Sequence, residues 1–172
     1  ADGRAIPYSI YDTLANLGFV VVGTSHETPA FAVESIVLWW RVCAQKRYPT
    51  AKALLILADC GGGNSARSRA WKYHLANQLC VPYNVTVTVC HYPPGASKWN
   101  PVDHRLHPEI SKNWAGKPLV TYDTVMNYIR TTKTDTGLRV QARLVRKQYA
   151  KGEKISDAEM ALLPIIRHKN KP

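Results

Sequence analysis

The fold of this 172-residue chain is decided by the stretch at residues 53–72, ALLILADCGGGNSARSRAWK. Its first six residues are all apolar, which predicts a strand buried on both faces, as in a parallel strand with helices above and below it. Asp59 ends this strand, three glycines follow, and residues 66–80 repeat apolar side chains at helical spacing, with Asn64 or Ser65 as the expected cap. A carboxylate at the end of such a strand lies where α/β sheets place their ligand sites.

The segments on either side alternate between strand and helix patterns. Asn16 to Gly18 favours a hairpin turn, and Thr28 followed by Pro29 marks a helix start. The other expected elements are strands at 6–14, 19–25 and 85–91, helices at 30–47, about 101–114 and about 121–132, a strand or helix at 138–145, and a short helix from Ser156. Strands that alternate with helices in this way predict an α/β fold whose mixed sheet is flanked by helices.

The charge of the chain points to a polyanionic partner. It carries a net charge of +11, and residues 104–172 hold 14 Lys and Arg against 6 Asp and Glu. A basic C-terminal half of this kind suits DNA or RNA, because neutralising phosphates supplies most non-specific affinity. A basic surface without a partner remains the alternative. We expect no membrane association, since the apolar runs are far shorter than the ~20 residues that a spanning helix needs.

The four cysteines form no CxxC pair. This excludes a zinc knuckle by pattern and gives no disulfide framework. We expect buried, reduced core thiols and hence a reducing bacterial cytoplasm, with nucleoid association when the protein is bound to DNA.

Two acidic residues are candidates for chemistry. The glycines at 61–63 carry no side chains, so a metal ion or a phosphate could approach Asp59 closely, although a turn acid that caps the next helix is an equal alternative. Asp103 follows the helix start at Asn100-Pro101, where an acid commonly caps a helix. Basic and aromatic side chains surround it: Lys98, Trp99, His104, Arg105 and His107. The two histidines are either metal ligands or part of an exposed basic helix.

Two carboxylates from separate strand and helix ends can hold hard divalent cations, Mg²⁺ first and Mn²⁺ second. In phosphoryl transfer, paired ions ~4 Å apart activate the attacking oxygen and stabilise the leaving one. Two acids rarely suffice for such a site, so a third is expected. Asp12 and Glu27 are the acids in the region of the expected hairpin, and neither is assigned to the site.

Longer motifs carry a family resemblance. The strings YPTAKALLILADCGGGNSARSRAWK, VCHYPPGASKWNPVDHRLHPEISKNWAGKPLV and YDTLANLGFVVVGTSHETPAFAVESIVLWW resemble the Rhodopirellula-type (ISAzo-type) insertion-sequence transposases, over about residues 6–157. The resemblance implies a DDE catalytic domain with a ribonuclease H-like fold, which cuts transposon ends with metal-activated water and joins them to target DNA. Asp59 matches the second catalytic acid of the family. Asp103 stands where the third is normally Glu, and its carboxylate is ~1.5 Å shorter in reach.

The resemblance also implies a missing part. The first catalytic acid of the family lies on a central strand upstream of residue 6, so we expect residues 1–145 to form a partial ribonuclease H-like domain, followed by a basic arm at 146–172. We expect a truncated, inactive transposase fragment that binds transposon-end and target DNA, with a homo-oligomer on DNA as one expected assembly. The alternatives are a non-enzymatic DNA-binding relic or recruited domain, and an unrelated phosphohydrolase. The expected DNA contacts are Arg67, Lys98, Trp99, Arg105 and Lys112.

Overall fold

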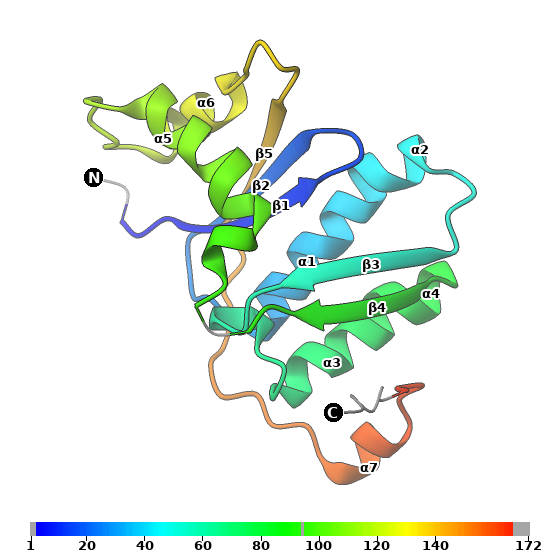
Figure 1. Cartoon of the computed structure of the whole chain (residues 1–172). Coiled ribbons are helices and arrows are strands. Elements are labelled where there is room, and N and C mark those ends of the chain that lie inside the picture. The colour runs from blue at the N-terminus through cyan, green and yellow to red at the C-terminus, as the bar shows by residue number, and fades with distance from the viewer. Residues whose placement is uncertain (1–2, 94, 167–172) are drawn as a thin grey trace.

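The computed structural model describes residues 3–93 and 95–166 and contains two small sheets (Figure 1). In the first sheet, β1 (Ile6–Asp12) and β2 (Leu17–Gly23) form an antiparallel hairpin, and β5 (Arg139–Val145) pairs with β2 in parallel, giving the order β1-β2-β5. The expected hairpin is confirmed, with Asn16 in the turn at a positive φ of 52°. The segment left open between strand and helix is the strand β5.

The second sheet has two parallel strands, β3 (Ala53–Ala58) and β4 (Thr86–His91), with Ala53 opposite Thr86 and Ala58 opposite His91. Both strands were expected from their apolar and alternating patterns. The architecture is therefore a mixed α/β one, as the element order predicts.

Two long helical segments cover one face of both sheets (Figure 1). The first comprises α1 (Pro29–Trp39), a π-helical turn (Trp40–Ala44) and α2 (Gln45–Arg47). The second comprises α3 (Arg69–Leu75), a π-helical turn (Ala76–Cys80) and α4 (Val81–Tyr83). Thr28 caps α1 as expected, since its hydroxyl accepts a hydrogen bond of 3.2 Å from the backbone N–H of Phe31. For α3 the expected cap is wrong: the hydroxyl of Ser68 accepts from Trp71 N at 3.1 Å, so the helix begins after Ser68.

The remaining helices follow β4 and precede or follow β5. They are a π-helical turn (Val102–Leu106) that leads into α5 (His107–Trp114), then α6 (Tyr122–Thr131) and α7 (Asp157–Ala161), with 3₁₀ turns at Gly62–Asn64 and Ser97–Trp99. The helices expected near 101–114, near 121–132 and after Ser156 are thus confirmed. Pro108 within the helical run 102–114 lacks a backbone N–H, and the run there changes from π-helical to α-helical hydrogen bonding.

The core lies on both faces of β2. Phe19 and Val21 point into a cluster with α1, whereas Val20 and Val22 point to the other face and pack with Leu106 and its neighbours on α5 and α6. All four of these β2 residues are 1% exposed. Because neighbouring residues of a strand alternate between faces, the central residues 19–22 of β2 need apolar side chains at every position and have them.

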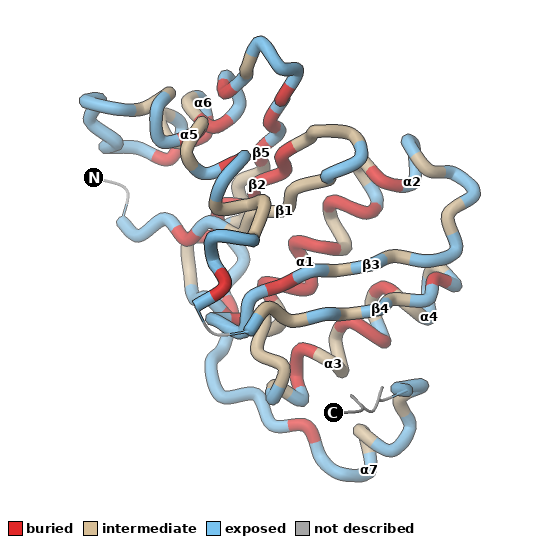
Figure 2. The backbone as a smooth tube through the Cα atoms, in the orientation of Figure 1, coloured by how far each residue is buried: buried red, intermediate tan, exposed pale blue. Residues whose placement is uncertain are grey.

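The prediction that β3 is buried on both faces is wrong. Leu54 and Ile56 pack on the helices, but Leu55 and Leu57 on the opposite face are 59% and 49% exposed (Figure 2). The long helical segments cover only one face of this sheet, so every second side chain of β3 meets solvent. An apolar run therefore did not distinguish a strand covered twice from a strand covered once.

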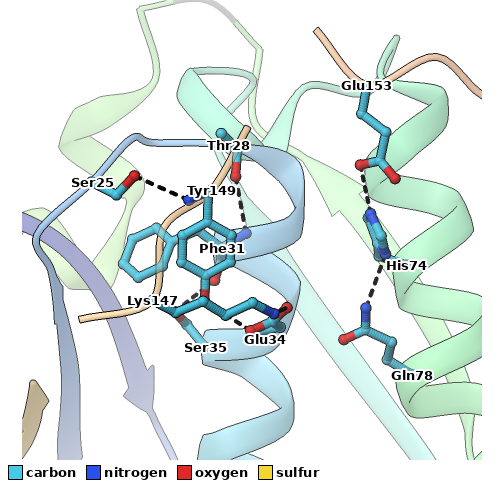
Figure 3. A network of polar contacts seen from close by, with 10 residues as sticks. All are labelled: Ser25, Thr28, Phe31, Glu34, Ser35, His74, Gln78, Lys147, Tyr149 and Glu153. Carbon is cyan, nitrogen blue, oxygen red and sulfur yellow. Dashed lines mark hydrogen bonds and ion pairs between the residues drawn. The ribbon is translucent and has the colours of Figure 1, made fainter. Parts of the chain in front are cut away.

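The segment after β5 is anchored to α1 and α3 by polar contacts (Figure 3). The hydroxyl of Tyr149 donates to Glu34 Oε2 at 2.8 Å, Lys147 Nζ lies 2.6 Å from Glu34 Oε1, and the backbone N–H of Tyr149 donates to Ser25 Oγ at 3.0 Å. Further along, Glu153 pairs with His74 at 2.7 Å. Tyr149 is buried in the α1 core, so at least this part of the segment at 146–172 packs on the main body; residues 167–172 lie outside the described range.

The cysteines only partly match expectation. All four are free thiols, but Cys60 and Cys90 are exposed, whereas Cys43 and Cys80 are half-buried. The expectation of buried core thiols is wrong for Cys60 and Cys90 because both lie on or beside the open sheet of β3 and β4. Among the described residues, no helix is long and apolar enough to cross a membrane.

Candidate functional site

Asp59 lies directly after β3, in an exposed turn, and a chain of hydrogen bonds holds its carboxylate. The side-chain amide of Asn64 donates to Asp59 Oδ1 at 3.3 Å, and the hydroxyl of Tyr8 donates to Asn64 Oδ1 at 2.8 Å. The ring Nε2 of His91 lies 2.8 Å from the backbone carbonyl oxygen of Asn64 and fixes the turn to β4. Asn64, which the sequence suggested as a helix cap, thus acts as the bridge between β1 and Asp59.

The pKa of the Tyr8 hydroxyl depends on the charges around Asp59. Burial raises the pKa of its hydroxyl above the usual range; the hydrogen bond to Asn64 opposes this rise, and the Asp59 and Glu27 carboxylates add to it. Both acids are therefore close enough to act on the same hydroxyl group. Glu27 was considered from the sequence and left out of the site, and the structure places it on the same side of β1 as Asp59.

The three glycines have packing roles. Gly62 has a positive φ of 51°, and a Cβ atom there would collide with the Glu27 carboxylate. A Cβ at Gly63 would lie 2.8 Å from the backbone oxygen of Thr28 and from Ala32 Cβ, at the start of α1. Only Gly61 faces Asp59, with its Cβ position 3.3 Å from Asp59 Oδ2. The glycine run is thus explained largely by the close approach of Glu27 and α1.

Asp103 lies in the π-helical turn before α5, and its carboxylate is bound on both oxygens. Asn100 Nδ2 donates to Asp103 Oδ2 at 3.1 Å, and Asp103 Oδ1 lies 3.4 Å from His107 Nδ1. Asn100 also caps this helix start, since its Oδ1 accepts from Val102 N at 3.2 Å. Asn100 therefore caps the helix start through its Oδ1 and holds the carboxylate of Asp103 through its Nδ2. A capped helix start does not exclude Asp103 from a site.

His107 connects Asp103 to β1. Its Nε2 lies 3.0 Å from Ser9 Oγ, so α5 is tied to β1 by the imidazole that neighbours Asp103. Tyr8 and Ser9 are consecutive on β1 and point to opposite faces of the strand. Tyr8 reaches the turn that holds Asp59, and Ser9 reaches the helix that holds Asp103. One strand thereby positions both acids, a relation that no local sequence pattern indicates.

A groove runs between β1 and β3, with a volume of about 700 Å³. Asp59, Glu27, Asp103 and His107 line it, and Trp39 of α1 and Trp40 of the π-helical turn after it contribute apolar lining. β1 is hydrogen-bonded only to β2, and β3 only to β4, in the part of the chain that the structure describes. The strand edges that face the groove are therefore unpaired. Within the same described residues, no three His, Cys, Asp or Glu side chains converge well enough to hold a metal ion.

The expected DNA contacts come from several elements and differ in exposure. Arg67, Lys98 and Arg105 are exposed. Trp99 is 68% exposed, and the ammonium group of Lys98 lies 5.2 Å from the centre of its ring, a cation–π contact. Lys112 is 2.6 Å from Glu109 Oε1 and is partly neutralised by that ion pair, which weakens it as a phosphate ligand.

Comparison with known proteins gives a family assignment. The family model described as the Rhodopirellula transposase DDE domain matches residues 1–172. Searches of curated proteins and of solved structures returned no match. Since the family model spans all 172 residues, the chain belongs to the Rhodopirellula transposase DDE domain family.

Proposed function

We propose that this chain supplies Asp59 and Asp103 as two carboxylate ligands of a Mg²⁺- or Mn²⁺-dependent site that cuts and joins transposon DNA. The observation that carries the proposal is that both acids line one groove although they come from different elements. The oxygen donors fit a hard cation. Asn64 donates to Asp59 Oδ1 and leaves Oδ2 for a ligand, whereas at Asp103 Asn100 holds Oδ2 and the imidazole of His107, 3.4 Å from Oδ1, would have to release that oxygen to an ion. A divalent ion held there would activate the attacking oxygen and stabilise the leaving oxygen of a phosphodiester.

We further propose that an additional strand completes the site by entering the groove between β1 and β3. A strand parallel to β3 would end beside Asp59, because parallel strands present their carboxyl ends at the same edge. An acid at that end would be the third ligand, and the completed sheet would have the ribonuclease H-like order. The unpaired edges of β1 and β3 and the apolar lining from α1 support this proposal. The buried indole N–H of Trp40, which lines the groove, has no acceptor among the described residues and also supports it.

Metal binding tests the two assigned ligands. Titration of the chain with Mn²⁺, followed by the electron paramagnetic resonance signal of the free ion, should detect a weak site. Asp59→Asn and Asp103→Asn should each abolish it, whereas Asp135→Asn, in the exposed turn before β5, should leave it intact. Equal binding by the two site variants and wild type would remove both acids from the metal site.

Activity tests the incomplete ligand set. We expect the purified 172-residue chain to join or nick DNA no faster than background in Mg²⁺ or Mn²⁺, because three ligands do not converge among its described residues. Metal-dependent joining of transposon-end DNA that is lost in Asp59→Asn would show that the chain needs no further strand.

DNA binding without cleavage is the second candidate function. It is favoured by the same incomplete ligand set together with the net charge of +11. In that case duplex binding should fall steeply with salt and should be unchanged in the Asp59→Asn and Asp103→Asn variants.

A further inference from the structure

We propose that β5 and the end of helix α2 form a second DNA-binding surface, separate from the carboxylates of Asp59 and Asp103. We call this surface the basic edge and define it by Lys46, Arg47, Arg139 and Arg143. The inference rests on the proposed function in one respect, namely that the polyanion is DNA. It concerns a face of the molecule to which neither the family match nor the groove assigns a role.

The β5 part of the basic edge, Arg139 and Arg143, lies on the far side of its sheet from the groove, whereas Lys46 and Arg47 precede Tyr48, which lines the groove. The strand order is β1-β2-β5, and β1 borders the groove, so β5 is the opposite edge. Two strand spacings separate β5 from β1, which amounts to about 10 Å. A duplex bound along β5 is therefore a different contact from one bound at Asp59 and Asp103.

The face of β5 that continues the α1 side of the sheet is polar instead of apolar. Arg139, Gln141 and Arg143 are opposite Leu17, Phe19 and Val21, and so share the face on which Phe19 and Val21 meet α1. Their alternate neighbours Val140 and Ala142 are buried in the other core cluster. On this face Arg139 and Gln141 are exposed and Arg143 is half-buried, whereas Val145 at the end of the strand packs against the α1 cluster. The part of the face that carries the arginines is therefore open to water.

The two arginines are positioned by partners that do not neutralise them. The guanidinium of Arg143 lies 5.9 Å from the centre of the Phe19 ring and donates to the carbonyl oxygen of Ala142 at 3.0 Å. Arg139 Nη1 donates to the carbonyl oxygens of Leu138 at 2.8 Å and of Thr134 at 3.3 Å. Among the described residues, none of the four cations of the basic edge has an ion-pair partner. A planar guanidinium held in place loses less freedom when it binds a phosphate.

The end of α2 and the start of β5 are linked through the first sheet: the hydroxyl of Tyr48 donates to Asp12, Asp12 is opposite Leu17, and Leu17 is opposite Arg139. The thiol of Cys43 feels three of the four cations. Burial raises the pKa of this thiol, whereas the charges of Arg143, Arg47 and Lys46 lower it, and the carboxylate of Asp12 raises it. The three cations come from β5 and α2, and Asp12 acts against them. That carboxylate is already hydrogen-bonded by the hydroxyl of Tyr48 at 3.0 Å and by the backbone N–H of Ala15 at 3.0 Å.

A double-stranded nucleic acid fits this surface better than an acidic peptide. The positive groups follow a strand edge and a helix end, and the backbone phosphates of a duplex present a continuous row of negative charge to such a surface. Arginine also presents a fork that matches phosphate oxygens. Binding to an acidic peptide is the outcome that would replace DNA as the partner.

The test is duplex binding by fluorescence anisotropy across a salt series. The basic-edge variant carries Lys46→Gln, Arg47→Gln, Arg139→Gln and Arg143→Gln. A matched variant loses the same charge elsewhere through Arg4→Gln, Lys117→Gln, Lys151→Gln and Lys154→Gln, all of which are exposed. We expect the basic-edge variant to bind about tenfold or more weakly near 0.1 M salt, with a salt slope lower by ~0.9 for each lost phosphate contact. The matched variant should change much less.

Two further variants separate the possible failures. Arg139→Lys with Arg143→Lys should retain most of the salt slope if charge at the surface matters, and would fail to do so if the arginines act only by packing.

A groove-side variant with Arg67→Gln, Lys98→Gln and Arg105→Gln tests the proposed function. Loss of binding in that variant alone would overturn the basic edge and leave the proposed function standing. Equal losses in the basic-edge and matched variants would reduce the effect to net charge and overturn the inference. The absence of any DNA binding by the wild-type chain would count against both proposals. If the wild-type chain then bound poly-glutamate, and the basic-edge variant did not, the basic edge would be a surface for an acidic protein.

Discussion

Strands β2 and β3 are similarly apolar and yet differently buried. β2, LGFVVVG, has four consecutive residues that are 1% exposed, whereas β3, ALLILA, has two leucines that are 59% and 49% exposed. β2 lies between β1 and β5, with α1 on one face and the α5–α6 side on the other. β3 has one partner strand and helices on one face only. An apolar sequence therefore allows a strand to be buried, and the elements packed around the strand determine whether one face or both are covered.

The largest expected effect comes from matched leucine truncations in the two regions. Leu106 is fully buried against β2, and Leu106→Ala should lower the free energy of unfolding by about 2–5 kcal/mol, since it removes transfer energy and leaves a cavity. Leu57→Ala removes the same atoms from a half-exposed position and should cost under about 1 kcal/mol. Urea unfolding followed by circular dichroism measures both. Equal costs would mean that the outer face of β3 is covered in solution.

A second prediction concerns the turn after β3. Gly62→Ala should destabilise the protein by about 1–3 kcal/mol, because the residue has φ +51° and its Cβ would collide with Glu27. Gly116 is the control, since it has φ +69° with open space around it. Gly116→Ala should lower the free energy of unfolding only by the cost of holding alanine at a positive φ. Glu27→Ala should recover some of the Gly62→Ala loss in the double variant. Purely additive costs in that thermal-unfolding cycle would contradict the contact.

The free energy of unfolding should fall at alkaline pH because of Tyr149, which is buried in the core against α1. Burial first, and then the hydrogen bond and charge of Glu34, raise the pKa of this hydroxyl in the folded state above its ordinary value. The folded state therefore holds the proton more tightly than the unfolded one, and its stabilising contribution is full below about pH 10 and is lost as the pH rises further. Tyr149→Phe should flatten the fall in unfolding free energy between about pH 9.5 and 11.

Tyr73→Phe is the control for losing a tyrosine hydroxyl from a half-exposed site. Tyr8, whose pKa is likewise raised by burial, should supply part of the slope that remains in Tyr149→Phe. A slope in Tyr149→Phe as steep as in wild type would show that the hydroxyl of Tyr149 titrates alike in both states.

Sequence reasoning predicted most elements of this fold because their signals are local. Thr28 with Pro29 marked α1, and the alternation in residues 85–91 marked β4. It could not choose between strand and helix for residues 138–145, because only pairing with β2 decides that segment. It also misplaced the start of α3, since Asn64, the expected cap, is engaged by Tyr8 from 56 residues away.

The candidate site, too, could be predicted only in part. Asp59 and Asp103 could be proposed from their positions at element ends and from the family resemblance. Their supports could not, because Tyr8 and Ser9 reach them only through the alternation of β1 between two packed faces. Contacts between elements far apart in sequence leave no local pattern in a single chain.

The smallest expected effect is also the one that tests the comparison most directly. Leu55→Thr exchanges an exposed apolar side chain for one that is β-branched, polar and well suited to a strand, so the unfolding free energy should change by no more than about 0.5 kcal/mol. Val21→Thr, in the fully covered strand, places an extra hydroxyl in the core and should cost clearly more. If Leu55→Thr proved as costly as Val21→Thr, and if its cost grew with protein concentration, the open face of β3 would be an interface between copies of the chain. Exposure would then be a property of the isolated chain, and both strands would be fully covered in the assembly.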